Sequence, residues 1–313
     1  MKTIINPLKK DWTQILMRPT KTVDDIEHTV NQIFNDVQKN KDEAVTKYTK
    51  LYDGVIVKNM IVSEKEILEA IAIVPEKLKE AIQLAKKNIH MFHEAQQTSK
   101  VFVETTSGVS CWQEKKAIQK VGLYIPGGSA PLFSTVLMLA VPAQIAGCKE
   151  IVLCSPPNKE GKIHPAILYA ADLCGVTKII KVGGIQAIAG YTFGTETIPK
   201  VYKIFGPGNQ YVTVAKQLAT KYGVAIDMPA GPSELLVVAD DSAKASYVAS
   251  DLLSQAEHGA DSQVLLVSTS KELLKEVSEE IEKQLLELPR VDIAQKAINN
   301  SKSIFVENDQ IAL

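Results

Sequence analysis

Polar side chains interrupt an apolar helical stripe near the end of the chain. Within "DLLSQAEHG", Asp251, Gln255 and His258 lie four and then three residues apart, a spacing that places side chains on one side of an α-helix. Val248 and Leu252 share that side, so the polar residues would face the core and need partners. Histidine is a common zinc ligand and a glutamine carbonyl is a possible one. The pattern indicates half of a metal site or, alternatively, a satisfied polar cluster in the core.

Glycine-rich turns follow three apolar stretches that are expected to be strands. They are "YIPGGSAP" at 124–131, "VGGIQAIAG" at 182–190 and "FGPGNQY" at 205–211. Ligands of open α/β sheets bind beyond the carboxyl ends of the strands, where helix N-termini offer free N–H groups. None of the turns fits Gly-x-Gly-x-x-Gly followed by an acidic residue about 20 positions later. Each alone indicates tight geometry, whereas together they favour a dinucleotide-like ligand.

Other candidates for chemistry are weaker. Ser233 in "MPAGPSE" could be a nucleophile, but the chain lacks a Gly-x-Ser-x-Gly elbow there, which favours a hydrogen-bonding or turn role. His90 and His93 are spaced for a metal, yet no third ligand is near, and a solvated or capping pair is the alternative. Cys148 and Cys154 lack Cys-x-x-Cys spacing and are typical of buried small hydrophobic residues.

The elements that must position these residues alternate along most of the chain. Helical spacing dominates residues 1–100, including a capping-box pattern at Ser63 and Glu66. A short hairpin is expected from Val101, and strands then alternate with helices, which predicts parallel sheets wrapped by helices.

The expected fold class is therefore α/β, with two Rossmann-like, incomplete parallel-sheet units that carry helices on both faces and follow an N-terminal helical segment. We expect a helical region at 1–100 that packs on the second unit. The first α/β unit is expected at 101–226 and the second, truncated at its C-terminal end, at 227–313.

Composition excludes several function classes. The chain has 313 residues, 45% hydrophobic and 23% charged, with a formal net charge of −1. No basic block indicates a nucleic-acid partner. No apolar run reaches the roughly 18 residues of a membrane span, and the first residues lack the apolar core of a secretory signal. We expect a cytoplasmic protein. The chain stops directly after the expected strand "SIFVEN", which suggests a truncated form or a fragment.

Long segments of the chain resemble the histidinol dehydrogenase family. The matching runs are "YIPGGSAPLFSTVLMLAVPAQIAGC", "VGGIQAIAGYTFGTETIPKV", "KIFGPGNQYVTVAK", "DMPAGPSELLVVAD" and "ASDLLSQAEHGADSQV", with "DW" and "RP" near the start. The resemblance implies oxidation of L-histidinol to L-histidine through the aldehyde, in histidine biosynthesis, with NAD and a bound zinc. It also implies a homodimer and an NAD site lined by Tyr124, Gln186 and Asn209.

The same resemblance also implies roles for the polar residues near the end of the chain. It implies that Ser233 contacts the substrate and that Gln255 and His258 bind zinc and substrate, whereas Asp251 has no role carried over. A zinc held by neutral imidazole would fix the substrate alcohol near the nicotinamide and would bind less well at low pH.

One departure from the family matters for activity. Family members continue past Leu313 with a Glu-His acid/base pair, and with an Asp and a His that complete the zinc shell, the His coming from the partner subunit. We therefore expect weak zinc binding and little or no activity from this chain. The alternatives are a non-catalytic α/β nucleotide-binding fragment and a dehydrogenase of aldehydes, which would need a catalytic cysteine in an exposed loop.

Overall fold

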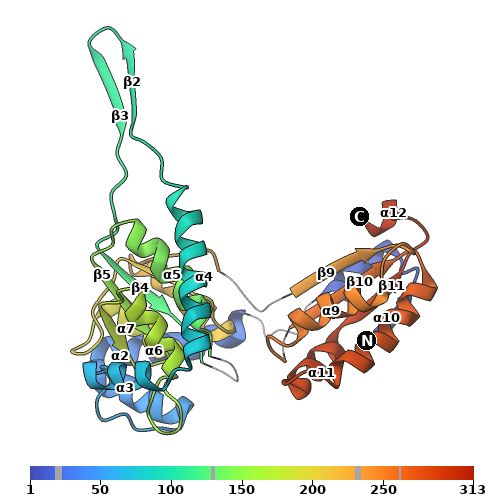
Figure 1. Cartoon of the computed structure of the whole chain (residues 1–313), viewed down its shortest axis with the longest axis horizontal. Helices are drawn as coiled ribbons and strands as arrows, with labels where there is room; N and C mark the ends of the chain where they lie inside the picture. Colours follow the sequence, from blue (N-terminus) through green and yellow to red (C-terminus); the bar gives the residue numbers. More distant parts are fainter. Residues whose placement is uncertain (18–22, 128–130, 230–233, 261) are drawn as a thin grey trace. The chain divides into compact units, whose positions relative to one another are not determined.

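The chain forms two compact units, each with its own parallel sheet. The computed structural model describes residues 1–17, 23–127, 131–229, 234–260 and 262–313. The larger unit is Val23–Pro229, and the smaller unit combines Met1–Thr22 with Ala230–Leu313. Both are drawn in Figure 1. Parallel sheets flanked by helices confirm the predicted α/β class.

The larger unit is built on a five-stranded parallel sheet with the order β6-β5-β4-β7-β8. Its strands are β4 (Lys120–Tyr124), β5 (Glu150–Cys154), β6 (Lys178–Ile180), β7 (Lys203–Phe205) and β8 (Ala225–Ile226). From β4 the chain adds β5 and β6 on one side, and then returns to add β7 and β8 on the other. The order therefore reverses between β4 and β7, and such a switch point is where doubly wound sheets bind ligands.

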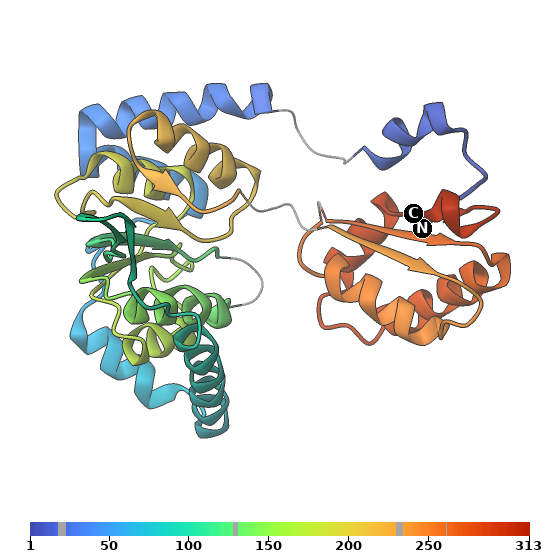
Figure 2. The same cartoon turned by 90° about the horizontal axis from the view of Figure 1, so that it is seen from above.

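Helices cover both faces of this sheet because its strands are apolar on both sides. Val121 and Leu123 of β4 belong to one buried core, whereas Tyr124 belongs to the core of the opposite face, as strand alternation requires. Figure 2 shows the helices in layers on the two sides of the sheet. The first core holds α5 (Phe133–Ile145) and α6 (Pro165–Leu173), and the second holds α7 (Gly184–Phe193) and α8 (Gln210–Lys221).

The helices between residues 23 and 94 form outer layers on this same unit, which corrects the expected packing of residues 1–100 on the second unit for that part; residues 1–22 do belong to the smaller unit. The helix α2 (Val23–Asp53) contacts α7 and α8, while α3 (Glu64–Ile73) contacts α6 and α4 (Glu76–Glu94) contacts α5. These outer helices are needed because of the helices that they cover. Residues all round α6 and α7 are buried, and a helix that is apolar all round needs cover on its outer side.

The smaller unit has a four-stranded parallel sheet in the order β1-β11-β10-β9. Its strands are β1 (Lys2–Ile5), β9 (Glu234–Ala239), β10 (Gln263–Ser268) and β11 (Lys302–Phe305), and its main helices are α9 (Ala245–Ala256), α10 (Lys271–Leu285) and α11 (Val291–Asn300). The shorter helices are η1 (Lys9–Asp11), α1 (Trp12–Leu16) and α12 (Asp309–Ala312). The strand β1 is a correction, since the first residues were read as helical. Four residues are too few to show a strand period, and the pairing with β11 decides their conformation.

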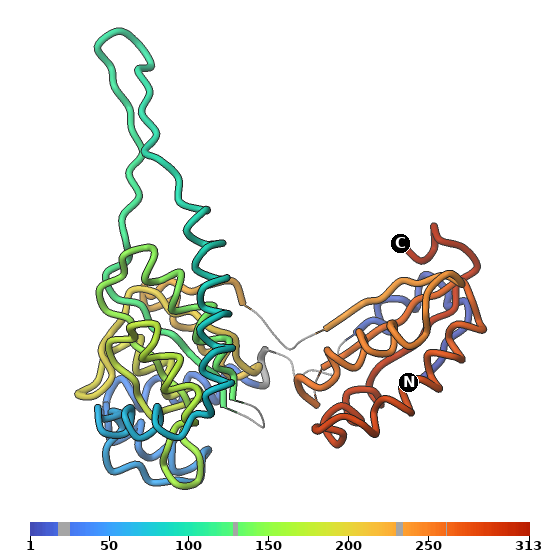
Figure 3. The backbone as a smooth tube through the Cα atoms, viewed as in Figure 1, coloured from blue at the N-terminus to red at the C-terminus, as the bar shows by residue number. Residues whose placement is uncertain are grey.

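The predicted hairpin after Val101 is confirmed. Strands β2 (Val101–Thr106) and β3 (Val109–Gln113) pair antiparallel, and every residue of both is exposed. The tube in Figure 3 shows this hairpin projecting from the unit beyond α4. None of the helices in the described part of the chain combines the length and apolarity that crossing a membrane requires.

Candidate active site

A cavity of about 1100 Å³ lies in the larger unit, at the carboxyl ends of its strands. Its walls include residues that end or directly follow β4 and β5, residues of the first turn of α7, and residues at the start of α8. The end of α2 closes another side with Tyr52 and Asp53. Three residues that the resemblance assigned to one site, Tyr124, Gln186 and Asn209, all line this cavity. The cavity therefore lies where a doubly wound sheet presents a ligand site.

The second glycine-rich turn starts α7 against Tyr124. Gly184 has a φ of +62°, a conformation that side chains with a Cβ rarely adopt. Its N–H donates to the Tyr124 hydroxyl at 3.1 Å. Burial, together with the charge of nearby Asp53, raises the pKa of Tyr124 although the Gly184 hydrogen bond opposes it, so this residue acts as a neutral hydroxyl.

Gln186 is the polar group in the cavity wall that lacks partners. Its side chain is 0% exposed, and neither Nε2 nor Oε1 has a hydrogen-bond partner among the described residues. A buried amide in this state costs about 1–3 kcal/mol per lost partner. A ligand in the cavity would supply the missing partners.

The third glycine-rich turn holds Asn209 at the start of α8. The Asn209 Oδ1 accepts from the Val212 N–H at 3.1 Å, which caps the helix. A buried lysine, Lys216, donates to the Gly206 carbonyl at 2.6 Å and forms an ion pair with Asp227. Asp227 also accepts from the Gly206 N–H at 2.8 Å. This network fixes the turn, and sequence reasoning missed it because "VTVAKQL" reads as an ordinary amphipathic helix.

The turn itself leaves no room for a larger residue. Gly206 has a φ of +129°, and a Cβ there would lie 2.1 Å from the Tyr124 carbonyl oxygen. The first and third glycine-rich turns are therefore in direct backbone contact. Gly128, Ser129 and Ala130 of the first turn lie outside the described residues.

A carboxyl group that the sequence analysis missed, Asp53, lines the cavity at the end of α2. Burial raises the pKa of Asp53 to about 6, and its Oδ2 has no hydrogen-bond partner among the described residues. The sequence gives no signal for this residue, because the break at Lys41 that divides α2 (φ 49°, ψ −127°) cannot be seen in the helical pattern.

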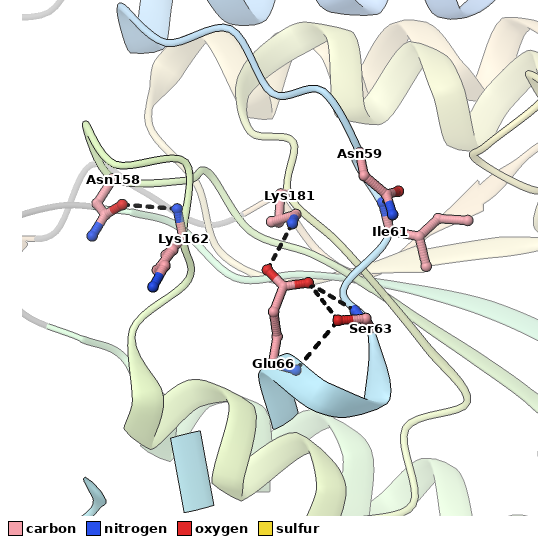
Figure 4. Close-up of polar contacts among 7 residues, drawn as sticks. All are labelled: Asn59, Ile61, Ser63, Glu66, Asn158, Lys162 and Lys181. Atoms are coloured by element: carbon pink, nitrogen blue, oxygen red, sulfur yellow. Dashed lines mark hydrogen bonds and ion pairs between the residues drawn. The ribbon is translucent and has the colours of Figure 1, made fainter. Parts of the chain in front are cut away.

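Polar contacts brace the loops on the β5 and β6 side of the cavity (Figure 4). Buried Lys181, next to the end of β6, donates to Glu66 at 2.8 Å. Glu66 also accepts from the N–H and hydroxyl of Ser63, which confirms the predicted capping box. Although burial acts in the opposite direction, these bonds hold the pKa of Glu66 below its usual value. The Asn158 side chain accepts from the Lys162 N–H at 2.8 Å and orders the cavity-lining loop that carries Lys162.

The predicted zinc residues, Gln255 and His258, lie in the smaller unit. Their positions correct the prediction that Asp251, Gln255 and His258 share the core-facing side of one helix. The helix α9 ends at Ala256, so His258 lies in the following turn, where its N–H donates to the Gln255 carbonyl at 3.3 Å. His258 and Asp251 are exposed and Gln255 is partly buried, whereas the apolar Val248 and Leu252 are buried. The polar residues therefore do not interrupt the core-facing stripe. Ser233 lies outside the described residues.

The donor set of the smaller unit does not fit a complete zinc shell. In the ranges that the structure describes, no three His, Cys, Asp or Glu side chains gather as metal ligands. Gln255 and His258 offer two donors, and zinc sites use three or four protein ligands. His90 and His93, the other candidates, contact Glu94 and Gln96.

Cys154 is buried, as predicted, and so is Cys174, whereas Cys148 is partly buried and Cys111 is exposed. Cys154 is 0% exposed, and burial raises the pKa of its thiol to about 12. Burial likewise raises the pKa of Cys174 to about 11 and raises that of Cys148. A protonated thiol is a poor nucleophile, so Cys148, Cys154 and Cys174 do not support the chemistry of an aldehyde dehydrogenase.

The fold and the cavity define a doubly wound α/β protein with a ligand site at the switch point of its sheet. The family model "Histidinol dehydrogenase" matches residues 16–313, and the chain belongs to this family. Its members are oxidoreductases of histidine biosynthesis.

Individual relatives agree with this assignment. A histidinol dehydrogenase of Bacteroides thetaiotaomicron is 56% identical over 313 residues, which are 100% of this chain and 73% of the relative. That of Escherichia coli K12 is 52% identical over 298 residues, covering 94% of this chain and 68% of its own length. The crystal structure of histidinol dehydrogenase from Elizabethkingia anophelis superimposes with a TM-score of 0.91 at 52% identity, covering 100% of this chain and 72% of that one.

Proposed function

We propose that the cavity of the larger unit binds NAD, the cofactor that the resemblance to the family implies for the oxidation of L-histidinol to L-histidine. The observation that carries this proposal is Gln186, a fully buried carboxamide in the cavity wall whose two polar atoms have no partner among the described residues. A ligand that offers both donors and acceptors removes the cost of burying this group. A dinucleotide offers both, from its ribose hydroxyls, amide and phosphate oxygens.

The surroundings of Gln186 suit the phosphates of such a ligand. Tyr124 and Asn209 lie beside the N-terminal ends of α7 and α8, and helix N-termini carry partial positive charge that favours anions. Lys159 and Lys162 line the same cavity and add full positive charges. These residues bind and orient the ligand.

The cofactor and the protein chain would contribute different parts of the chemistry. When bound, NAD supplies the acceptor for the hydride that leaves the substrate carbon. The chain's part is positioning. Gln186 provides a rigid hydrogen-bonding group held by α7, and the braced Gly206 turn holds Asn209 in place.

For the substrate, we propose that Ser233, Gln255 and His258 contact histidinol, and that Gln255 and His258 also contribute to zinc binding. Membership of the family supports this assignment, as does the exposure of the His258 side chain to incoming ligands. The described residues do not complete the metal shell, so these two side chains are partial ligands at most. A homodimer and a cytoplasmic location are further parts of the proposal, supported by the resemblance to the family alone.

Calorimetric titration with NAD tests the site. We expect the protein to bind NAD, and Gln186→Leu to weaken binding by about tenfold or more, since it removes hydrogen bonds worth about 1–3 kcal/mol. Thr192→Val is the control, because Thr192 lies on the same helix and its hydroxyl already donates to the Ile188 carbonyl at 2.7 Å. Equal affinities for the native chain and Gln186→Leu would refute the proposed role of the cavity.

A further inference from the structure

Asp53 is placed where a carboxylate is costly. It is the last residue of α2, and the C-terminal end of a helix carries partial negative charge that repels an anion. Its Oδ2 is buried and has no hydrogen-bond partner among the described residues. Burial raises its pKa to about 6. Within the described chain nothing offsets these costs.

The position of Asp53 points to a ligand. The carboxyl lines the cavity together with Thr29 and Tyr52 of the same helix. It lines the same cavity as Tyr124, one of the residues of the NAD site proposed above, and its charge raises the pKa of Tyr124. Neither of the cavity lysines, Lys159 and Lys162, forms an ion pair with it in the described part of the chain. The cavity therefore has a free acceptor group besides its positive groups.

The chemistry of the group limits what can satisfy it. An ionised carboxylate only accepts hydrogen bonds, so the ligand must bring donors. The two neighbouring hydroxyls of a ribose provide two donors for its two oxygens, and hydrogen bonds to a charged acceptor are the stronger kind. A phosphate on one of these hydroxyls would remove a donor and place negative charge against the carboxylate.

We propose that Asp53 is a specificity-determining residue that accepts the ribose hydroxyls of the cofactor and excludes a 2′-phosphorylated one. The inference rests on the proposed NAD site and deepens it. It predicts that the protein prefers NAD to NADP, and that this preference comes from a single side chain at the end of α2.

Calorimetric titrations with NAD and with NADP at about pH 8, where a carboxyl group is ionised, test the inference. We expect Asp53→Asn to weaken NAD binding by about tenfold and to reduce the ratio of NADP to NAD dissociation constants by about tenfold or more. Glu160→Gln is the control, because it removes an exposed charge from the loop beside the cavity without lining it. It should leave the ratio unchanged.

The possible failures are distinguishable. Asp53→Asn removes a buried charge, so its thermal unfolding temperature should not fall, and weaker binding cannot then come from unfolding. If NAD binding depends on Gln186 but the cofactor ratio is the same in Asp53→Asn, the inference is wrong and the proposed function stands. If the native chain binds neither cofactor, both are wrong.

Discussion

At the scale of single residues, the cavity keeps polar groups that the fold does not satisfy. Gln186 and Asp53 both have buried oxygens without partners among the described residues, whereas neighbouring polar groups such as Thr192 and Tyr191 donate to backbone carbonyls. Unsatisfied groups lower stability and are kept where a ligand uses them. Replacing Gln186 or Asp53 should therefore raise the free energy of unfolding of the ligand-free protein and weaken ligand binding.

Gln186→Leu should raise the free energy of unfolding of the ligand-free protein by about 1 kcal/mol, because an apolar side chain of similar size replaces two unsatisfied polar atoms. Chemical denaturation monitored by circular dichroism measures this change. Thr192→Val, which removes a hydrogen bond that is made, should lower stability instead. A destabilised Gln186→Leu variant would mean that the amide has partners in the free protein.

The effect of Asp53 on stability should depend on pH. Its folded pKa of about 6 lies above the ordinary value of 3.8, so the folded state holds the proton more tightly than the unfolded state does. The contribution of this group to stability is therefore present at low pH and is lost as the pH rises through about 6. Relative to the native chain, Asp53→Asn should gain about 1–2 kcal/mol between about pH 4 and pH 7, allowing for partial exposure of the group.

Denaturant titrations across this pH range check the sign. Glu66→Gln serves as the opposite case, because Lys181 and Ser63 hold the pKa of Glu66 below its usual value. That variant should be less stable than the native chain near neutral pH, and the difference should shrink as the pH falls. A difference between Asp53→Asn and the native chain that does not vary with pH would contradict the account.

At the scale of elements, sequence patterns predict turns and caps that depend on neighbouring residues. They miss elements whose conformation depends on contacts with residues far away in the sequence. The glycine-rich turns and the capping box at Ser63 are local and could be predicted. The strand β1 depends on pairing with residues about 300 positions away. The ion pair of Lys216 and Asp227 joins α8 to the residue after β8, and helical periodicity gives no sign of it.

Lys216→Met should lower the free energy of unfolding by about 3 kcal/mol, because it leaves Asp227 partly buried without its ion-pair partner. It should also weaken NAD binding, since the Gly206 turn that carries Asn209 loses a hydrogen bond. Lys221→Met is the matched control on the same helix, where an exposed pair with Glu27 is broken, and its effect should be much smaller. Equal effects of the two variants would show that the buried pair does not brace the turn.

At the scale of the whole molecule, the division into units was the part of the fold that the sequence concealed. The smaller unit takes residues from both ends of the chain. No change in composition marks the point near residue 22 where the chain passes from the smaller unit to the larger one. The helices α2, α3 and α4 belong with the larger unit because they bury the apolar outer sides of its inner helices. The class and, apart from β1, most of the order of strands and helices could be predicted, but the partners of α2, α3 and α4 could not.

A fragment of residues 23–229 should fold by itself and bind NAD with the affinity of the whole chain, within about twofold. Both cores on the faces of its sheet, and every described residue that lines the cavity, come from within this range. Circular dichroism, cooperative unfolding and calorimetry measure the two properties. A folded fragment without NAD affinity would show that the smaller unit supplies part of the site.

The most direct test of the central claim locates the bound cofactor in the larger unit by amide hydrogen exchange of the whole chain with and without NAD. We predict slower exchange with NAD at 183–188 and 206–212, where the two glycine-rich turns start α7 and α8 against the cavity. Protection that spares both segments, or that lies only in the smaller unit, would contradict the assignment of this cavity to NAD.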